Sequence, residues 1–292
     1  MRLFDAHVHL QDPKISRWLS QLLAELPQVG LEGAVVNGTS ESDWSAVAQL
    51  ARRAEWVVPS FGLHPWWVGT ESTDWLDRLE RYLRDHPNSG VGEIGLHQVK
   101  TSPARHGQMQ NRDLKNPSIS DQVCVLVQQI KLAARMNRVI TLHCFLAWTE
   151  MAAVLSNETL PSRGFLIHAY SGDASLVPLL LDLGAYFSFN GYHLGERHAS
   201  RKAIFERLPS NRILVETDAP ALALPKSLIE FRFQTSGNEG PDLNHPANLV
   251  VTYRELARLR KTEYALLVDQ VADNFAALFG RPRIKSSQVP PL

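Results

Sequence analysis

The sequence has little cysteine and no net charge. Its 292 residues include only two cysteines, Cys124 and Cys144, which are too few for a disulfide framework and indicate a reducing compartment. Lysine plus arginine and aspartate plus glutamate both number 30, so the formal net charge is zero. This balance excludes a protein-wide basic field that would attract a polyanion. Any binding of nucleic acid must then use a local patch.

Long apolar runs are also missing. No stretch approaches the roughly 20 apolar residues that a membrane-spanning helix needs, so we expect no membrane segment. The first residues lack a charged segment followed by an apolar core, so we expect no signal peptide and a cytoplasmic location. With 44% hydrophobic and 21% charged residues, the composition is that of an ordinary globular protein.

Short β-rich segments alternate with segments of helical periodicity along most of the chain. This alternation predicts parallel strands joined by crossover helices. Eight such units match a single closed (β/α)8 TIM barrel, which typically takes about 250 residues. A doubly wound open sheet is the alternative, although no GxGxxG motif follows the first strand. The predicted strands are Leu3–His7, Gly33–Asn37, Val57–Leu63, Gly90–Leu96, Val139–His143, Phe165–His168, Ala185–Phe189 and Ile213–Thr217, and the clearest helical segments are Trp44–Arg53, Trp75–Arg84, Gln122–Met136, Ser175–Leu183 and Arg201–Leu208.

Two polar segments interrupt these regular units. Residues His97–Asp121 are rich in turn formers and predict an insertion after the fourth strand, either a lid or substrate platform or a loop without a role. Residues Phe231–Asn248 predict a second irregular loop, after the eighth strand. We expect one domain over residues 1–283 and a disordered tail over residues 284–292.

The stretch FDAHVHL, Phe4–Leu10, places two histidines one residue apart in an apolar run. In an extended strand, Asp5, His7 and His9 point to one face and the apolar residues to the other. This alternation is typical of a half-buried strand whose histidines face water. The alternative is that these histidines bind a ligand at the end of a barrel strand.

Histidines and carboxylates recur at other predicted strand ends. In a TIM barrel the carboxyl ends of all strands meet at one mouth, so residues far apart in sequence meet there. Four histidines and two carboxylates are good ligands for divalent metals, and a carboxylate can bridge the two ions of a site for phosphoester hydrolysis. The set is His7, His9, Glu93, His143, His168 and Asp218.

The motifs around these residues stand in an order that resembles the TatD-related metal-dependent hydrolases. They are FDAHVHL, GLHP, VGEIGL, TLHCF, LIHAYSG and VETDAP, and the resemblance runs from Leu3 to Gly280. It implies a TIM barrel of the metallo-amidohydrolase group, and many members of the family are described as deoxyribonucleases. It also implies two metal ions, the first bound by His7, His9, Glu93 and Asp218 and the second by Glu93, His143 and His168. A glutamate at position 93, where many binuclear amidohydrolases carry a carboxylated lysine, favours this family over a phosphotriesterase-like one.

The sequence departs from the family pattern in two motifs. His97 stands where an aspartate is usual, and Phe145 stands in place of the arginine of HxR. An arginine at the mouth would clamp a phosphate bidentately, so its absence leaves the substrate open. His64 and His97 are candidates for substrate binding, and Glu216 is a candidate for orienting a ligand histidine. We expect most of the other loop histidines at the surface, namely His106, His193, His198 and His245.

The sequence therefore predicts a hydrolase of phosphodiester bonds, specifically a deoxyribonuclease with two divalent ions (Zn, Mg or Mn) and DNA as its substrate. Such ions lower the pKa of a bound water to near 7. Asp218 and Glu93 are the catalytic candidates, with Asp218 orienting or deprotonating the water. Two alternatives stay open, namely hydrolysis of a small amide, ester or lactone on the same metals, and a binding module without turnover.

Overall fold

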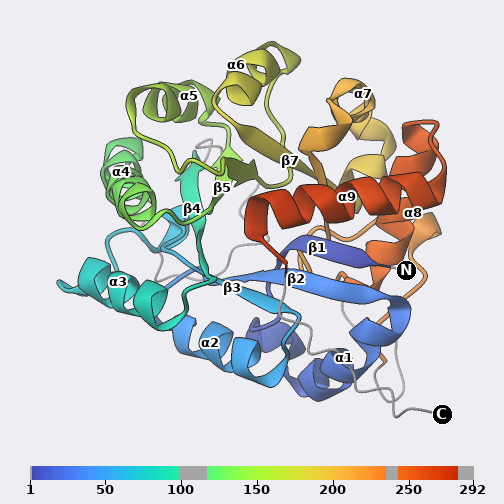
Figure 1. Ribbon diagram of the computed structural model, residues 1–292, viewed down its shortest axis with the longest axis horizontal. Helices are drawn as coiled ribbons and strands as arrows, with labels where there is room; N and C mark the ends of the chain where they lie inside the picture. Colours follow the sequence, from blue (N-terminus) through green and yellow to red (C-terminus); the bar gives the residue numbers. More distant parts are fainter. Residues whose placement is uncertain (1, 99–116, 235–242, 282–292) are drawn as a thin grey trace, which may run out of the picture.

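Eight parallel strands form one sheet whose spatial order follows the sequence from β1 to β8. The computed structural model describes residues 2–98, 117–234 and 243–281 (Figure 1). The amide of Asp218 donates to the carbonyl of His7, and that of His9 to the carbonyl of Ala219, which joins the end of β8 to β1. The sequential order and this closure confirm the TIM barrel and exclude the doubly wound sheet. The strands are β1 (Leu3–Val8), β2 (Leu31–Asn37), β3 (Val57–Phe61), β4 (Gly90–His97), β5 (Ile140–Phe145), β6 (Phe165–Ile167), β7 (Ala185–Asn190) and β8 (Ile213–Glu216).

Helices surround the sheet on its outer side (Figure 1). The predicted helix over Ser175–Leu183 is divided into a 3-10 turn and α6, because Pro178 lacks an amide donor and is favoured in the first turn of a helix. Within the described ranges, no helix combines the length and the apolar character needed to cross a bilayer. The helices are α1 (Leu19–Glu25), α2 (Trp44–Arg53), α3 (Trp75–Asp85), α4 (Ile119–Met136), α5 (Trp148–Asn157), α6 (Val177–Asp182), α7 (Ala199–Arg207), α8 (Leu249–Leu259) and α9 (Tyr264–Phe279).

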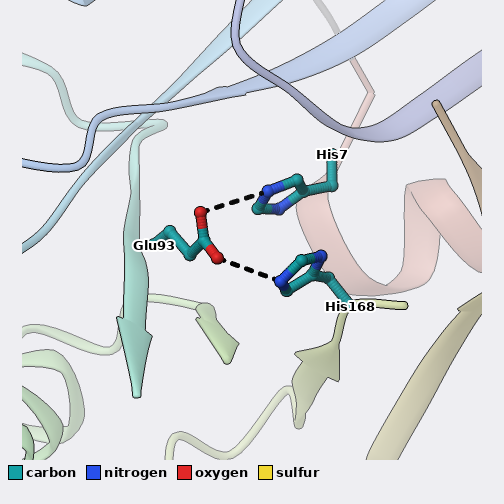
Figure 2. Close-up of side chains that lie close together, drawn as sticks. All are labelled: His7, Glu93 and His168. Atoms are coloured by element: carbon teal, nitrogen blue, oxygen red, sulfur yellow. Dashed lines mark ion pairs between the residues drawn. The ribbon is translucent and has the colours of Figure 1, made fainter. Parts of the chain in front are cut away.

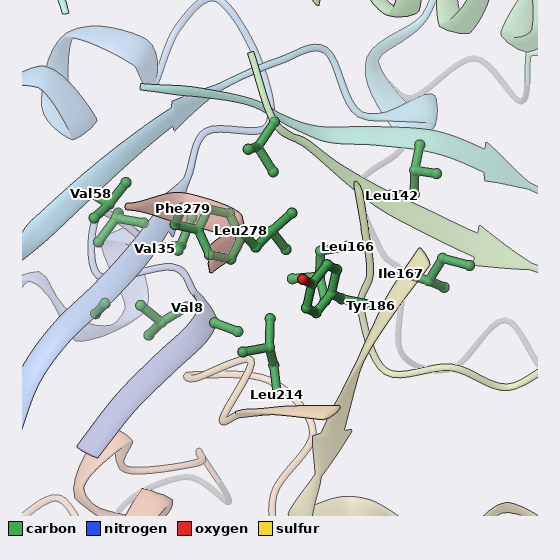
Figure 3. Close-up of a cluster of buried hydrophobic side chains, with 14 of the residues drawn as sticks. Val8, Val35, Val58, Leu142, Leu166, Ile167, Tyr186, Leu214, Leu278 and Phe279 are labelled. Atoms are coloured by element: carbon green, nitrogen blue, oxygen red, sulfur yellow. The ribbon is translucent and has the colours of Figure 1, made fainter. Parts of the chain in front are cut away.

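Strand β1 is buried along its whole length, which excludes for His7 the simpler of the two alternatives, a half-buried strand whose histidines face water. In a closed barrel, one face of each strand points inward and the other packs under the helices, and both faces lose contact with water. Figure 3 shows apolar side chains of several strands in one cluster with Leu278 and Phe279 of α9. Helix α9 thus covers part of the barrel.

A buried carboxylate connects the first and last strands. Asp5 Oδ1 accepts hydrogen bonds from the amides of His7 (3.2 Å) and Thr217 (3.0 Å), and Oδ2 accepts from Thr217 Oγ1 (2.6 Å). Burial raises the pKa of Asp5 to about 8. The hydroxyl of Tyr253 on α8 donates to the carbonyl of Phe4 and accepts from its amide. These contacts fix the backbone directly before His7 and tie it to the end of β8.

Three expectations fall on residues outside the described ranges. In the expected insertion His97–Asp121, the structure places His97 at the end of β4 and Ile119 at the start of α4, but residues 99–116 are outside. Residues 235–242 of the second loop and the expected tail over 284–292 are outside as well. The lid and the tail therefore stay predictions.

Candidate metal centre

The six side chains predicted as metal ligands lie together at the carboxyl end of the barrel. His7 Nε2 and His9 Nε2 are 3.0 Å apart, and His9 Nε2 is 3.3 Å from Asp218 Oδ1. On the other side, His143 Nδ1 is 3.2 Å from His168 Nε2. His7 lies in β1 and His143 in β5, whereas His9, His168 and Asp218 directly follow or lie just after β1, β6 and β8. These side chains converge, as their positions at strand ends predict.

Glu93, within β4, lies beside the stacked rings of His7 and His168, whose centroids are 4.0 Å apart, and each of its two oxygens faces one of these imidazoles (Figure 2). Its Oε2 is 3.4 Å from His7 Nε2 and 3.3 Å from His9 Nε2. Its Oε1 is 2.9 Å from both His143 Nδ1 and His168 Nε2. Each carboxylate oxygen therefore faces a different pair of imidazoles, which is the arrangement that a bridging carboxylate requires.

The backbone holds several of these side chains in place. Asp218 follows β8 with a φ of +55°, in the left-handed region that aspartate tolerates better than most residues. The ring of His9, just after β1, is fixed by a 2.9 Å contact between its Nδ1 and the carbonyl of Asn37. The amide of Glu93 donates to the carbonyl of Gly38. The directions of these side chains are thus set by main-chain contacts with neighbouring strands and loops.

Opposite charges dominate the electrostatics of the site. Burial opposes ionisation of Glu93, but the imidazoles around it, first His64 and then His168, hold the pKa of its carboxyl well below its usual range. Burial likewise opposes ionisation of Asp218, and its hydrogen bond with His9 outweighs burial and lowers its pKa. Both carboxyl groups are therefore carboxylates at neutral pH.

The donor set fits divalent metal ions. Two imidazole nitrogens that face each other at 3.0 or 3.2 Å need a proton or a cation between them, since their lone pairs repel. Imidazole nitrogens and carboxylate oxygens are ligands for Zn and neighbouring transition metals. The ligand atoms of three groups lie within 4.8 Å of one another, namely His7/Glu93/His168, His7/His9/Asp218 and His64/Glu93/His143.

His64 belongs to this cluster as well, although the sequence analysis assigns it to substrate binding alone. Its Nε2 is 3.5 Å from Glu93 Oε1, and its Nδ1 accepts a hydrogen bond from the amide of Trp66. Burial lowers the pKa of His64 to about 4, so its ring is neutral at pH 7 and able to offer a lone pair. The Pro-Trp turn after His64 explains this orientation, because it brings an amide onto Nδ1.

His97 contacts a predicted ligand directly. Its Nδ1 is 2.9 Å from His143 Nε2, and its ring stacks on Phe145 with centroids 4.8 Å apart. Burial lowers the pKa of His97 to about 3. The two residues that depart from the family motifs, His97 and Phe145, are thus in contact with each other.

Two glutamines on α4 support the site, and the sequence analysis missed both. Gln122 accepts from the amide of His97 and donates to its carbonyl, at 2.7 and 3.1 Å. Gln129 makes the same pair of contacts with Leu63, at 2.8 and 3.1 Å, directly before His64. The available signal was two glutamines seven residues apart, on one face of a helix that is otherwise apolar there.

Glu216 lies beside His168, as the sequence analysis proposes for an orienting residue. Its Oε1 is 3.6 Å from His168 Nδ1 and 3.1 Å from Asn190 Nδ2. In contrast, the expectation of surface histidines is wrong for His193 and His245, which are 3% and 6% exposed. The loops after β7 and β8 fold back onto the barrel and bury them, and His106 lies outside the described residues.

A match to a protein-family model identifies the family of this chain. The model described as TatD related DNase matches residues 4–280. The chain belongs to the TatD related DNase family. Membership confirms the resemblance and the expectation of a metal-dependent hydrolase.

Individual members of the TatD family match along almost the whole chain. The uncharacterized metal-dependent hydrolase YjjV of Escherichia coli K12 is 26% identical over 285 residues, covering 96% of this chain and 99% of the relative. The 3'-5' ssDNA/RNA exonuclease TatD of Enterobacter lignolyticus is 26% identical, covering 95% and 99%. The crystal structure of YjjV superposes with a TM-score of 0.81 at 24% identity, covering 96% and 98%. A TatD family hydrolase of Entamoeba histolytica superposes with a TM-score of 0.77 at 14% identity, covering 96% and 99%.

Proposed function

We propose that this protein hydrolyses phosphodiester bonds in nucleic acid and that single-stranded DNA is its substrate. The observation that carries the proposal is the position of Glu93, whose two oxygens face separate groups of histidines at one barrel mouth. Two-metal sites of this kind perform phosphoester hydrolysis. The Enterobacter lignolyticus relative is named as an exonuclease on ssDNA and RNA, which supports the choice of substrate.

We assign the six ligands to two divalent ions that share Glu93. His7, His9 and Asp218 would complete one site, and His143 and His168 the other. When bound, the ions would lower the pKa of a water and neutralise charge on the phosphoryl oxygens. Asp218 would orient that water and accept its proton, because its carboxyl is ionised and its Oδ1 faces His7 and His9.

Exposed aromatic rings at the mouth offer a surface for bases. Trp66 and Phe145 are 37% and 43% exposed, and their ring centroids lie 5.5 and 4.8 Å from that of His97. Stacking on such rings is worth about 1–3 kcal/mol per base and does not depend on sequence. We propose that this trio replaces the phosphate clamp of the missing arginine with base stacking. His64 then stays a candidate for contact with the phosphate.

The absent arginine also favours a second candidate, a metal-dependent hydrolase of a small amide, ester or lactone. The two are separated by rates on a 5'-labelled single-stranded oligonucleotide and on a panel of small esters, lactones and amides, each with and without chelator. We expect chelator-sensitive cleavage of the oligonucleotide, and a Trp66→Ala/Phe145→Ala variant with a raised KM on it. Leu266→Ala, an exposed apolar control on α9, should leave the KM unchanged. Turnover of small substrates only would contradict the nuclease assignment.

Metal content tests the shared glutamate independently of the substrate. Protein purified without chelator should approach two equivalents of divalent metal by elemental analysis, because six ligands are too many for one tetrahedral site. In Glu93→Gln, both sites lose a charged ligand, so the metal content should fall at both. A stoichiometry that stays at one under metal excess would contradict the bridging role of Glu93.

A further inference from the structure

A cavity lies at the opposite end of the barrel from the candidate metal centre. Its volume is about 510 Å³, and its wall includes Val57, Gly90 and Val139, at the starts of β3, β4 and β5, together with Phe279 at the end of α9. The metal centre gathers around the other ends of these strands. A volume of this size falls in the range of about 300–1,000 Å³ found for small-molecule sites.

The wall of this cavity carries an excess of positive charge. Arg52, Arg138, Arg163 and Arg281 line it, whereas Glu55 and Asp85 are the only acidic residues that line it within the described part of the chain. Four positive charges against two negative charges leave an excess of two. Among the residues that the structure describes, none of the four arginines forms an ion pair with a carboxylate, although seven other arginines do. Their charges are thus available to an anion.

Two buried donors beside this wall have no partner among the described residues. Ser89 is 4% exposed, and its Oγ makes no hydrogen bond to any described residue. Arg138 donates through Nη2 to the carbonyl of Leu83 at 2.9 Å, but its buried Nε is unpaired among the same residues. Buried polar groups are almost always satisfied, so these two donors beside the cavity are candidates for contact with an acceptor that binds there after a small rotation of their side chains.

The remaining wall is apolar and sets the size of the ligand. Pro59, Pro87, Val139 and Phe279 contribute to it. An inorganic phosphate would contact the arginines but would leave most of the 510 Å³ empty. A ligand that satisfies both parts has a phosphate at one end and a larger, partly apolar body.

We propose that this cavity binds a phosphorylated small molecule of mononucleotide size, held by Arg52, Arg138, Arg163 and Ser89. Arginine presents several donors in a planar fork, which suits the oxygens of a phosphate. The body of the ligand would lie on the apolar wall. None of these residues belongs to the metal centre, so the inference does not depend on the proposed function.

Calorimetric titration of the full-length protein tests this site, with deoxyadenosine monophosphate as the probe. The metal centre also attracts phosphate, so all titrations use a Glu93→Gln background. In that background the nucleotide should bind, and Arg52→Gln should weaken it about tenfold through loss of a charge-assisted contact. Arg53→Gln is the matched control, because Arg53 is the next exposed residue of α2 and does not line the cavity.

Four further measurements sharpen the test. The Ser89→Ala substitution should lower the affinity for the nucleotide. Deoxyadenosine, which lacks the phosphate, should bind more weakly than the nucleotide. Inorganic phosphate, which lacks the nucleoside body, should also bind more weakly. Oligonucleotide cleavage without added nucleotide should be equal in Arg52→Gln and wild type. The proposal is overturned by absence of nucleotide binding in the Glu93→Gln background, by equal affinities in Arg52→Gln and Arg53→Gln, or by deoxyadenosine binding as tightly as the nucleotide.

Discussion

The imidazole of His97 lies against that of His143, with 2.9 Å between Nδ1 of the first and Nε2 of the second. The other nitrogen of His143, Nδ1, faces Glu93 Oε1 at 2.9 Å. A metal-binding histidine usually has its second nitrogen held by a carboxylate, a carbonyl or water, which fixes the ring and raises its basicity. Here a neutral imidazole occupies that place, so His143 is fixed without the gain in basicity that a carboxylate would give.

His97→Ala removes the group that holds His143. Metal affinity or kcat should fall about 10- to 100-fold, as is typical when the partner of a ligand histidine is lost. His97→Asp, which restores the usual family residue, should preserve both. Metal titration together with kcat and KM on an oligonucleotide checks this prediction. A rise in KM alone, with metal affinity unchanged, would instead assign His97 to substrate binding.

Asp218→Asn keeps the size of the side chain but removes its charge and basicity. Loss of a general base costs about 10²–10⁴-fold in rate, and weaker metal binding would add to that. The barrel itself should stay folded by circular dichroism. The variant should still bind a single-stranded oligonucleotide, with an affinity that falls as salt rises, because phosphate contacts release counterions. Wild-type rates in Asp218→Asn would contradict its catalytic role.

Gln129→Leu tests the support that α4 gives to the site. The amide and carbonyl of Leu63 would lose their buried partners, so the free energy of unfolding should fall by about 1–3 kcal/mol. Gln128→Leu is the control, since Gln128 is exposed on the same helix and its loss should change stability by less than about 0.5 kcal/mol. Urea unfolding measures both. Equal free energies of unfolding in the Gln129→Leu and Gln128→Leu variants would show that the Gln129 contact contributes little to stability.

His193 should make the protein sensitive to acid. Burial, with smaller contributions from His198 and Arg201, lowers the pKa of His193 from 6.5 to about 3. Between these values the unfolded chain binds a proton that the folded chain does not, so stability is complete above about pH 7 and falls as the pH drops. The slope is at most about 1.4 kcal/mol per pH unit for one group. His193→Gln should reduce the loss in unfolding free energy between pH 7 and pH 5, and an unchanged loss would contradict this assignment.

The barrel and the clustering of the six candidate ligands follow from the sequence because both depend on periodic, local signals. Strand–helix alternation predicts the order of the strands, and the position of His143 or His168 at the end of a strand predicts convergence at the mouth. The residues whose hydrogen bonds hold the backbone of the site could not be predicted in this way. Gln122 and Gln129 act on backbone groups 25 and 66 positions away, with no local pattern that marks the pairing. The burial of His193 depends likewise on how a loop folds onto the barrel.

The link between Asp5 and Thr217 spans 212 positions of the chain. His9 likewise precedes Asp218 by 209 positions, although their side chains face each other at 3.3 Å. Contacts between such distant segments slow folding, since a long loop must close before they form. The candidate site that contains His7, His9 and Asp218 is therefore assembled only when the last strand of the barrel has closed onto the first, and we expect metal affinity to appear at that step of folding.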